Sequence, residues 1–230
     1  MLKFKKMMKK IGIIGLLLTL SLTTMAQVRY NSGGGSSKPK EKGFDPQKIV
    51  IGGGLDGRFW GGITYIYLAP MVGYKVTPNF LAGVNLGYQY VRIKNGREVY
   101  NTTTNRYETY PTNDHLFSPG LWLRYNIASF FAHAQFEYHV GNASWTDFAQ
   151  NAGGSGVEKV KLNYTLPSLL VGAGYRLPLG ERVSAYIGIY YDVLQNSTRK
   201  TVSASNGAQY EVASPYAGGI RPTIGFGIGF

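Results

Sequence analysis

Alternation of apolar and polar residues with a period of two recurs from residue 49 to residue 230, and it limits the possible folds more than any other sequence feature. No segment of this region sustains the 3.6-residue period of an amphipathic helix, so we predict an all-β fold. The alternating stretches are about 10 residues long, which is typical of a transmembrane antiparallel up-and-down β-barrel. We predict about eight strands, over residues 48–58, 63–75, 80–93, 116–127, 130–140, 164–177, 183–194 and 219–230.

The two faces of each predicted strand differ in chemistry. One face of the last strand carries the apolar residues Ile220, Ile224, Phe226, Ile228 and Phe230. The polar face of the fifth strand carries His133, Gln135, Glu137 and His139. Because four such groups would be costly in hydrocarbon, we expect polar faces to line the lumen and apolar faces to contact lipid. The alternative is a soluble β-sandwich or lipocalin-like barrel, but its aromatic residues would point into its core.

The connections between the predicted strands alternate in length. Residues 77–79, 128–129 and 178–181 are tight turns, whereas residues 94–115, 141–163 and 195–217 are long, polar loops. In outer-membrane barrels the short turns are periplasmic and the long loops are extracellular. We therefore expect the long loops outside the cell and both chain ends in the periplasm.

Outward-facing aromatic residues are predicted at two depths. Near the short turns lie Tyr74, Phe80, Tyr125, Phe130, Tyr175 and Phe230. Near the long loops lie Phe59, Tyr88, Tyr90, Phe117, Tyr138 and Tyr191. Two aromatic girdles on either side of aliphatic residues are favoured where a barrel meets the two membrane interfaces.

The N-terminal region predicts export. Residues 1–26 combine five lysines, an apolar run and the ending Thr24-Met25-Ala26, which is the pattern of a cleaved secretory signal peptide. The apolar run is shorter than the roughly 20 residues that a spanning helix needs. Removing these lysines lowers the net charge from +12 to +7. Residues 27–47, rich in Gly, Ser and Lys, predict a flexible periplasmic tail before a barrel at 48–230.

The signal peptide, the alternating strands and the terminal stretch from Ile224 to Phe230 resemble those of small Gram-negative outer-membrane barrels. This group includes the OmpA transmembrane domain, OmpX and OmpW-like proteins, and the Tyr-, Gly- and Asn-rich strands are also similar to barrels of Bacteroidetes. The resemblance implies that Phe226, Ile228 and Phe230 act as a signal for the outer-membrane assembly machinery. The positive charge that remains on the mature chain favours contact with anionic lipopolysaccharide, and the apolar faces favour contact with outer-membrane lipid.

The inward positions of the predicted barrel hold many charged and polar groups. We expect a polar network in the lumen, made of Asp56, Arg58, Arg124, His133, Glu137, Arg176, Asp192 and Arg221. A barrel of about eight strands is only wide enough to be filled by its own side chains, so a plugged lumen is expected. The alternative is a narrow anion or small-solute channel, because Lys75, Arg124 and Arg176 make the inner half basic.

We expect no enzyme activity, no cofactor and no metal site. The one candidate for catalysis is Ser118 with His139, because a two-residue turn at 128–129 would place them on facing strands and a Ser–His pair is the minimum for acyl transfer. The pair would make the chain a lipid A- or phospholipid-modifying barrel.

Aromatic residues of the long loops, such as Tyr107 and Trp145, suit a surface ligand or a partner membrane protein. Export and the sequence pattern argue against binding to nucleic acid.

Overall fold

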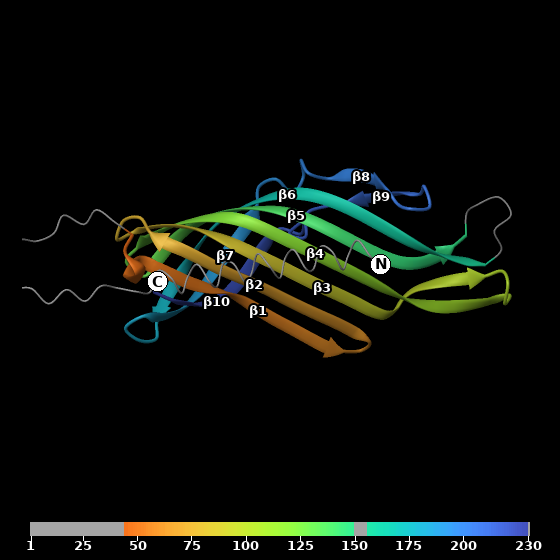
Figure 1. The fold of residues 1–230 in the computed structure, drawn as a ribbon, viewed down its shortest axis with the longest axis horizontal. Coiled ribbons are helices and arrows are strands. Elements are labelled where there is room, and N and C mark those ends of the chain that lie inside the picture. Colours follow the sequence, from red (N-terminus) through yellow and green to blue (C-terminus); the bar gives the residue numbers. More distant parts are fainter. Residues whose placement is uncertain (1–43, 150–155, 230) are drawn as a thin grey trace, which may run out of the picture. The chain divides into compact units, whose positions relative to one another are not determined.

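The computed structural model describes residues 44–149 and 156–229 of the chain. Eight antiparallel strands form a closed barrel in the order β1-β10-β7-β6-β5-β4-β3-β2 (Figure 1). They are β1 (Ile49–Trp60), β2 (Ile63–Lys75), β3 (Phe80–Asn101), β4 (Arg106–Ile127), β5 (Phe130–Phe148), β6 (Val157–Pro178), β7 (Val183–Asp192) and β10 (Ile220–Ile228). The predicted eight-stranded barrel is therefore confirmed. Within the described residues, no helix combines the length and apolarity needed to cross a membrane.

Several strands extend far beyond their predicted ends. β3 and β4 continue as a paired hairpin to Asn101 and Arg106, and β5 and β6 pair as far as Phe148 and Val157. The prediction that residues 94–115 and 141–163 are loops is thus largely wrong. Both faces of the β3–β4 extension are polar enough that the apolar alternation disappears, although Tyr, Thr and Val still favour strands. The β5–β6 extension instead buries Trp145, Val160 and Leu162 in an apolar cluster. Cross-strand contacts, such as the edge-to-face pair of Tyr100 and Tyr107, stabilise the hairpin.

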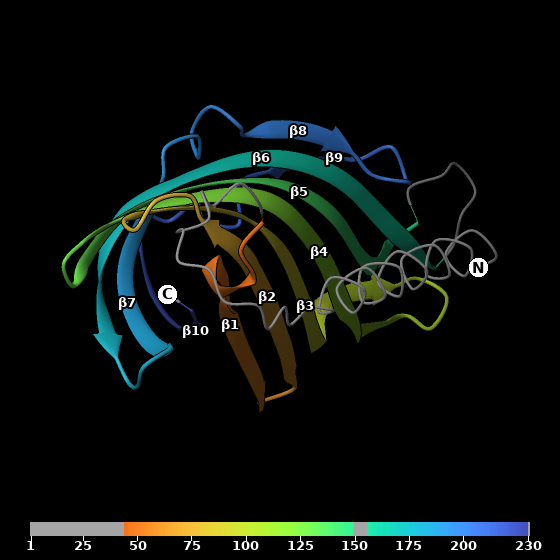
Figure 2. The same cartoon turned by 60° about the vertical axis from the view of Figure 1, so that its left-hand side comes forward.

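The third long connection also contains strands. β8 (Lys200–Ser203) and β9 (Gln209–Val212) form a separate two-stranded sheet. This sheet lies over β6, as Figure 2 shows, and the residues 195–217 that were predicted as a loop are only partly irregular. Ala204 and Val212 pack there in one apolar cluster with Trp145 and Val160. The sheet buries apolar residues that the barrel wall alone would leave exposed.

The two ends of the barrel differ in their connections. Residues 76–79, 128–129 and 179–182 form what we call the short-turn rim. The opposite end, the long-hairpin rim, carries the β3–β4 and β5–β6 hairpins, the segment 193–219 and the tight Gly61–Gly62 turn between β1 and β2. Gly61 and Gly62 both have positive φ angles, of 59° and 78°, as a two-residue turn of type I′ requires.

Side-chain exposure follows the predicted faces. On β4, Leu121 is 62% exposed and its neighbour Trp122 is 1% exposed. On β10, Ile224 is 67% exposed on the outer surface, whereas a Cβ added to the adjacent Gly225 would overlap the ring of Tyr186 in the lumen. The outer surface of the barrel is therefore apolar, and its inward glycines make room for large lumen side chains.

Some predicted features lie outside the described residues: the signal peptide at 1–26, residues 27–43 of the predicted tail, and Phe230. Residues 44–47, which were assigned to the tail, lie beside the short-turn rim. Phe44 stacks on Tyr74 with 5.7 Å between ring centroids, and the backbone N–H of Asp45 donates to the Tyr74 hydroxyl. A 3-10 turn, η1 (Pro46–Lys48), then leads into β1.

Candidate functional site

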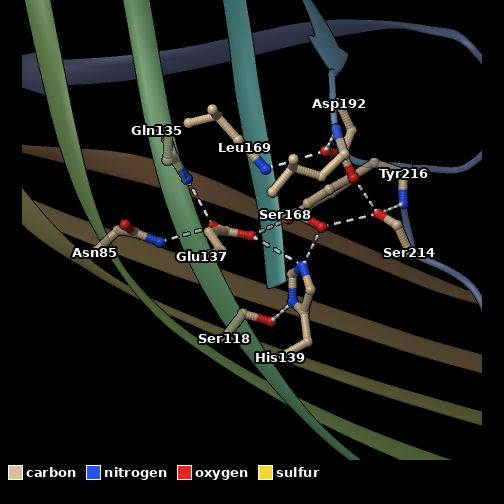
Figure 3. Close-up of polar contacts among 11 residues, drawn as sticks. Asn85, Ser118, Gln135, Glu137, His139, Ser168, Leu169, Asp192, Ser214 and Tyr216 are labelled. Atoms are coloured by element: carbon tan, nitrogen blue, oxygen red, sulfur yellow. Dashed lines mark hydrogen bonds and ion pairs between the residues drawn. The ribbon is translucent and has the colours of Figure 1, made fainter. Parts of the chain in front are cut away.

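A buried carboxylate occupies the middle of the lumen. Glu137 on β5 is 1% exposed, and its Oε1 accepts hydrogen bonds from Asn85 Nδ2 at 2.7 Å and Gln135 Nε2 at 2.6 Å (Figure 3). Its other oxygen, Oε2, accepts from the hydroxyl of Tyr216. Neutral donors from β3, β5 and the segment before β10 therefore hold this group, as a buried charge requires.

A second chain of hydrogen bonds starts at the predicted Ser–His pair. Ser118 Oγ lies 2.7 Å from His139 Nδ1, and His139 Nε2 lies 2.9 Å from Ser168 Oγ on β6. Ser168 Oγ is in turn 2.9 Å from Ser214 Oγ. Because β4 and β5 pair from Ile127 and Phe130 outward, the two-residue turn places Ser118 beside His139, as the sequence predicted.

The same chain ends on a fully buried aspartate. Ser214 Oγ donates to Asp192 Oδ2 at 2.5 Å, and Asp192 Oδ1 accepts from the backbone N–H groups of Leu169 and Leu194 (Figure 3). Glu137 Oε2 lies 3.8 Å from His139 Nε2, which links the two clusters. The result is a continuous polar network that connects β3, β4, β5, β6 and β7 with the segment before β10.

Aromatic rings surround the lumen arginines. The guanidinium carbon of Arg124 lies 4.3 Å from the ring centre of Phe131 and 4.7 Å from that of Tyr186. Arg221 lies 4.6 Å from the ring centre of Tyr216 and 5.6 Å from that of Tyr67. Such cation–π contacts stabilise a guanidinium more strongly when it is removed from water.

The remaining predicted network residues lie at different depths. His133 is buried, and its Nε2 is 2.9 Å from Gln135 Oε1. Asp56 and Arg58 form an ion pair at 3.3 Å on the part of β1 near the long-hairpin rim, where both side chains are partly exposed. Arg176 lies on β6 opposite Tyr186, close to the short-turn rim. The buried part of the network depends on amides, hydroxyls and aromatic rings more than on the predicted acid–base pairs.

Sequence reasoning missed four members of this network. Asn85 and Ser168 follow the inward period of β3 and β6, so the alternation contained a signal for both. Ser214 and Tyr216 belong to the segment between β9 and β10, which has no period. Their return into the lumen depends on tertiary contacts that the sequence pattern does not reveal.

The chemistry available to Ser118 and His139 is limited by their burial. Ser118 is 5% exposed and His139 is 0% exposed. A lumen cavity of about 190 Å³ is lined by residues that include Tyr67, Arg124, His133 and Arg221, but neither Ser118 nor His139 belongs to its lining. A substrate in this cavity would not reach the hydroxyl. Nor do the described residues contain a group of three or more His, Cys, Asp or Glu side chains that could hold a metal ion.

Comparisons with known proteins give one structural similarity. The sequence matches no protein-family model and no curated protein. Among solved structures, the chain is similar to the crystal structure of a major outer membrane protein from Thermus thermophilus. The similarity has a TM-score of 0.39 and 12% sequence identity, and it covers 78% of this chain and 98% of that protein.

Proposed function

We propose that this chain is an integral, non-enzymatic β-barrel of the outer membrane that serves in envelope structure or surface interaction. The observation that carries the proposal is the inverted distribution of polarity. Leu121, Ile224 and Phe226 are more than half exposed on the outer surface, while Glu137 and His139 are fully buried inside. This distribution supports a barrel surrounded by hydrocarbon over a soluble barrel with an apolar core.

The aromatic residues support the same location. Near the short-turn rim, Phe130 and Tyr175 pack edge to face across β5 and β6, with 5.2 Å between ring centroids. Near the other rim, Tyr88 is paired with Phe117 across β3 and β4. Aromatic rings at both limits of an apolar surface fit the two interfaces of a bilayer.

A blocked lumen is the second part of the proposal. Trp122, Phe131 and Tyr190 are each less than 8% exposed, and Tyr216 reaches Glu137 from the segment before β10. An eight-stranded barrel has little interior space beyond that needed for its side chains. We therefore expect no free passage of solutes along the barrel axis.

The proposed surface role rests on the projecting hairpins. The β3–β4 hairpin extends beyond the barrel wall and carries Tyr107, which is 71% exposed (Figure 1). Exposed aromatic residues are frequent at protein interaction sites. We place these hairpins outside the cell and the short-turn rim in the periplasm, with a surface ligand or partner membrane protein as the binding partner of the hairpins.

Two measurements test this proposal. Purified mature protein should need detergent to stay in solution and should migrate differently on a gel before and after heating. In planar bilayers it should give no stable conductance steps. A chain that is soluble without detergent would overturn the membrane location, whereas steady conductance would overturn the blocked lumen.

The second candidate function is a narrow anion or small-solute channel. It is favoured by the cavity near Arg124 and Arg221, since positive side chains in a pore select anions. Anion-selective conductance that is lost in Arg221→Gln would support it over the blocked barrel.

The third candidate, a lipid-modifying enzyme, depends on the 2.7 Å contact between Ser118 and His139. Identical lipid profiles in cells that carry wild type and Ser118→Ala would eliminate it.

A further inference from the structure

The barrel closes between β1 and β10, but this seam is paired over only part of its length. β1 pairs with β10 through only three residue pairs, from Ile51–Ile228 to Gly53–Phe226, although β1 pairs with β2 along its whole length. In the described chain, residues 54–60 of β1 and 220–225 of β10 have no ladder partner across this seam. The unpaired part is the half nearer the long-hairpin rim. Both strand edges therefore present free backbone donors and acceptors there.

Residue types along the seam provide physical reasons for this opening. If the register of the three pairs continued, Gly57 would face Pro222 and Arg58 would face Arg221. Proline has no N–H to donate to a ladder and is confined to strand edges, and like charges directly opposite each other destabilise strand pairing. Gly53, the last paired residue of β1, has a φ of 140°. A Cβ at Gly53 would overlap the backbone of Ala69, so only glycine fits β1 at the point where it leaves β10.

An outer groove and the lumen cavity lie on either side of the unpaired seam. The groove on the outer surface is lined by Leu55, Leu68, Pro70, Ile224 and Phe226, together with glycines of β1 and β10. The lumen cavity of about 190 Å³ is lined from the other side by Leu55, Asp56, Pro222 and Ile224. Since Leu55 and Ile224 line both spaces, only these segments of β1 and β10 separate the groove from the cavity at the unpaired seam.

The two spaces differ in chemistry. The groove is apolar on the surface that we place in lipid. The cavity is lined by Arg124 and Arg221, and its lining acid, Asp56, is paired with Arg58 at 3.3 Å. Among the described residues, no carboxylate lies within ion-pair distance of Arg221, and the nearby Glu137 is held by Asn85, Gln135 and Tyr216.

We propose that the open half of the β1–β10 seam is a lateral binding site for an amphiphile with an anionic head. The acyl chain lies in the outer groove, and a phosphate or carboxylate head enters the cavity beside Arg221 and Arg124. Free backbone N–H groups at the seam add donors for the head oxygens, because an open sheet edge in a membrane must find polar partners. A water molecule takes up about 30 Å³, so the cavity holds a head group but not a long chain.

The site rests on the membrane location proposed above, but its test is independent of it. We would titrate the purified barrel, in a neutral detergent, with dodecyl phosphate and with a neutral dodecyl glycoside, and follow binding by native mass spectrometry. Dodecyl phosphate should bind at least tenfold more tightly than the glycoside. Arg221→Gln should weaken binding of the phosphate at least tenfold and leave the glycoside unaffected. The matched control is Arg199→Gln, which removes an exposed arginine paired with Glu211 before β8 and should change neither affinity.

A second variant closes the seam. Arg58→Glu combined with Pro222→Val restores a backbone donor and places opposite charges on facing positions, so it should protect from hydrogen exchange those amides of residues 54–57 that point away from β2, and it should abolish phosphate binding. In wild type without probe those amides should exchange quickly. Their protection would mean that a strand already covers the seam, and it would overturn the proposal. Equal binding of the two probes, or unchanged phosphate binding in Arg221→Gln, would also overturn it. Solubility without detergent would instead overturn the membrane location.

Discussion

Large lumen side chains lie against glycines of neighbouring strands. A Cβ added to Gly73 on β2 would lie 2.6 Å from an atom of the Trp122 ring, and one added to Gly83 on β3 would lie 2.7 Å from the same ring. The indole N–H of Trp122 donates to the carbonyl of Val84 at 3.1 Å. The Trp122 ring therefore packs directly against the backbone at Gly73 and Gly83, where any larger residue would overlap it.

Gly73→Ala should consequently destabilise the barrel. Inserting a methyl group into a filled interior costs about 1–3 kcal/mol, because the ring of Trp122 must move from its position. Urea unfolding in detergent micelles measures this loss. The matched control is Gly54→Ala on β1, whose added Cβ would lie at an ordinary 3.6 Å from Tyr67. Equal stability of the two variants would show that the contact with Trp122 does not restrict Gly73.

The buried carboxylate of Glu137 yields a second prediction for single residues. Glu137→Ala should cost about 1–3 kcal/mol of unfolding free energy for each buried donor left unsatisfied, because Asn85, Gln135 and Tyr216 lose their acceptor. Glu137→Gln should cost less, since its amide oxygen still accepts part of these bonds. The temperature at which the folded band disappears on a gel reports both changes. If Glu137→Ala were as stable as wild type, the network would contribute nothing to the fold.

At the scale of the strands, the sequence predicted the part of the barrel that has an apolar face. β2 has the predicted bounds, and the other barrel strands start or end within a few residues of theirs at the short-turn rim. The extension of the β3–β4 hairpin beyond Ile93 was missed because both of its faces are polar. In the β5–β6 extension, Val160 and Leu162 do alternate with lysines, but this stretch was assigned to a loop. The register shift between Ile93 and Arg97 was also unpredictable, since a bulge in a polar hairpin leaves no periodic signal.

The candidate site was predictable to a similar extent. Ser118 and His139 could be paired because a two-residue turn fixes the register of β4 against β5. The same reasoning could not find the contact between Ser214 and Asp192, which joins an aperiodic segment to the end of β7. Nor could it find the open seam, since closure between the first and last barrel strands depends on no turn.

The β3–β4 hairpin should respond to acid at its tip. Hydrogen bonds to Glu108 from Tyr110, Thr104 and Asn101 lower the pKa of its carboxyl from 4.5 to about 2. A carboxyl whose pKa is lower in the folded state stabilises that state above its unfolded pKa, and the effect is lost as the pH falls towards the folded value. We expect amide exchange at residues 101–106 to accelerate as the pH falls from about 4.5 to about 2, after correction for the intrinsic exchange rate.

The control for this pH dependence is Glu108→Gln, which retains an acceptor oxygen but has no titratable group. It should make the corrected exchange at the hairpin tip independent of pH over the same interval. Wild-type exchange that stays constant over that interval would contradict a stabilising role for the ionised carboxylate. Residues 128–129 at the opposite rim should not respond in either protein.

At the scale of the whole molecule, the stability of the barrel depends both on its apolar outer surface and on its polar lumen. Outward residues such as Leu121, Leu123 and Phe136 are exposed, so the fold gains little from burying them against protein. The interior is filled by aromatic rings, arginine and a hydrogen-bonded acid network. Such a molecule gains stability from its apolar surface only when a lipid or detergent phase covers that surface.

Depth-dependent substitutions on the outer surface test this view of the molecule. Leu121 and Ile127 lie on the same face of β4 and are almost equally exposed, at 62% and 61%. Ile127 adjoins the turn at the short-turn rim. Leu121 lies in mid-strand, where it pairs with Val84 and Phe136. In a lipid bilayer, Leu121→Arg should cost about 2–4 kcal/mol and Ile127→Arg about 0–1 kcal/mol, because the cost of a charge falls from the midplane towards the interface. Unfolding in phospholipid vesicles measures the difference. A soluble barrel would tolerate both substitutions equally, so equal costs would contradict a membrane-embedded β4.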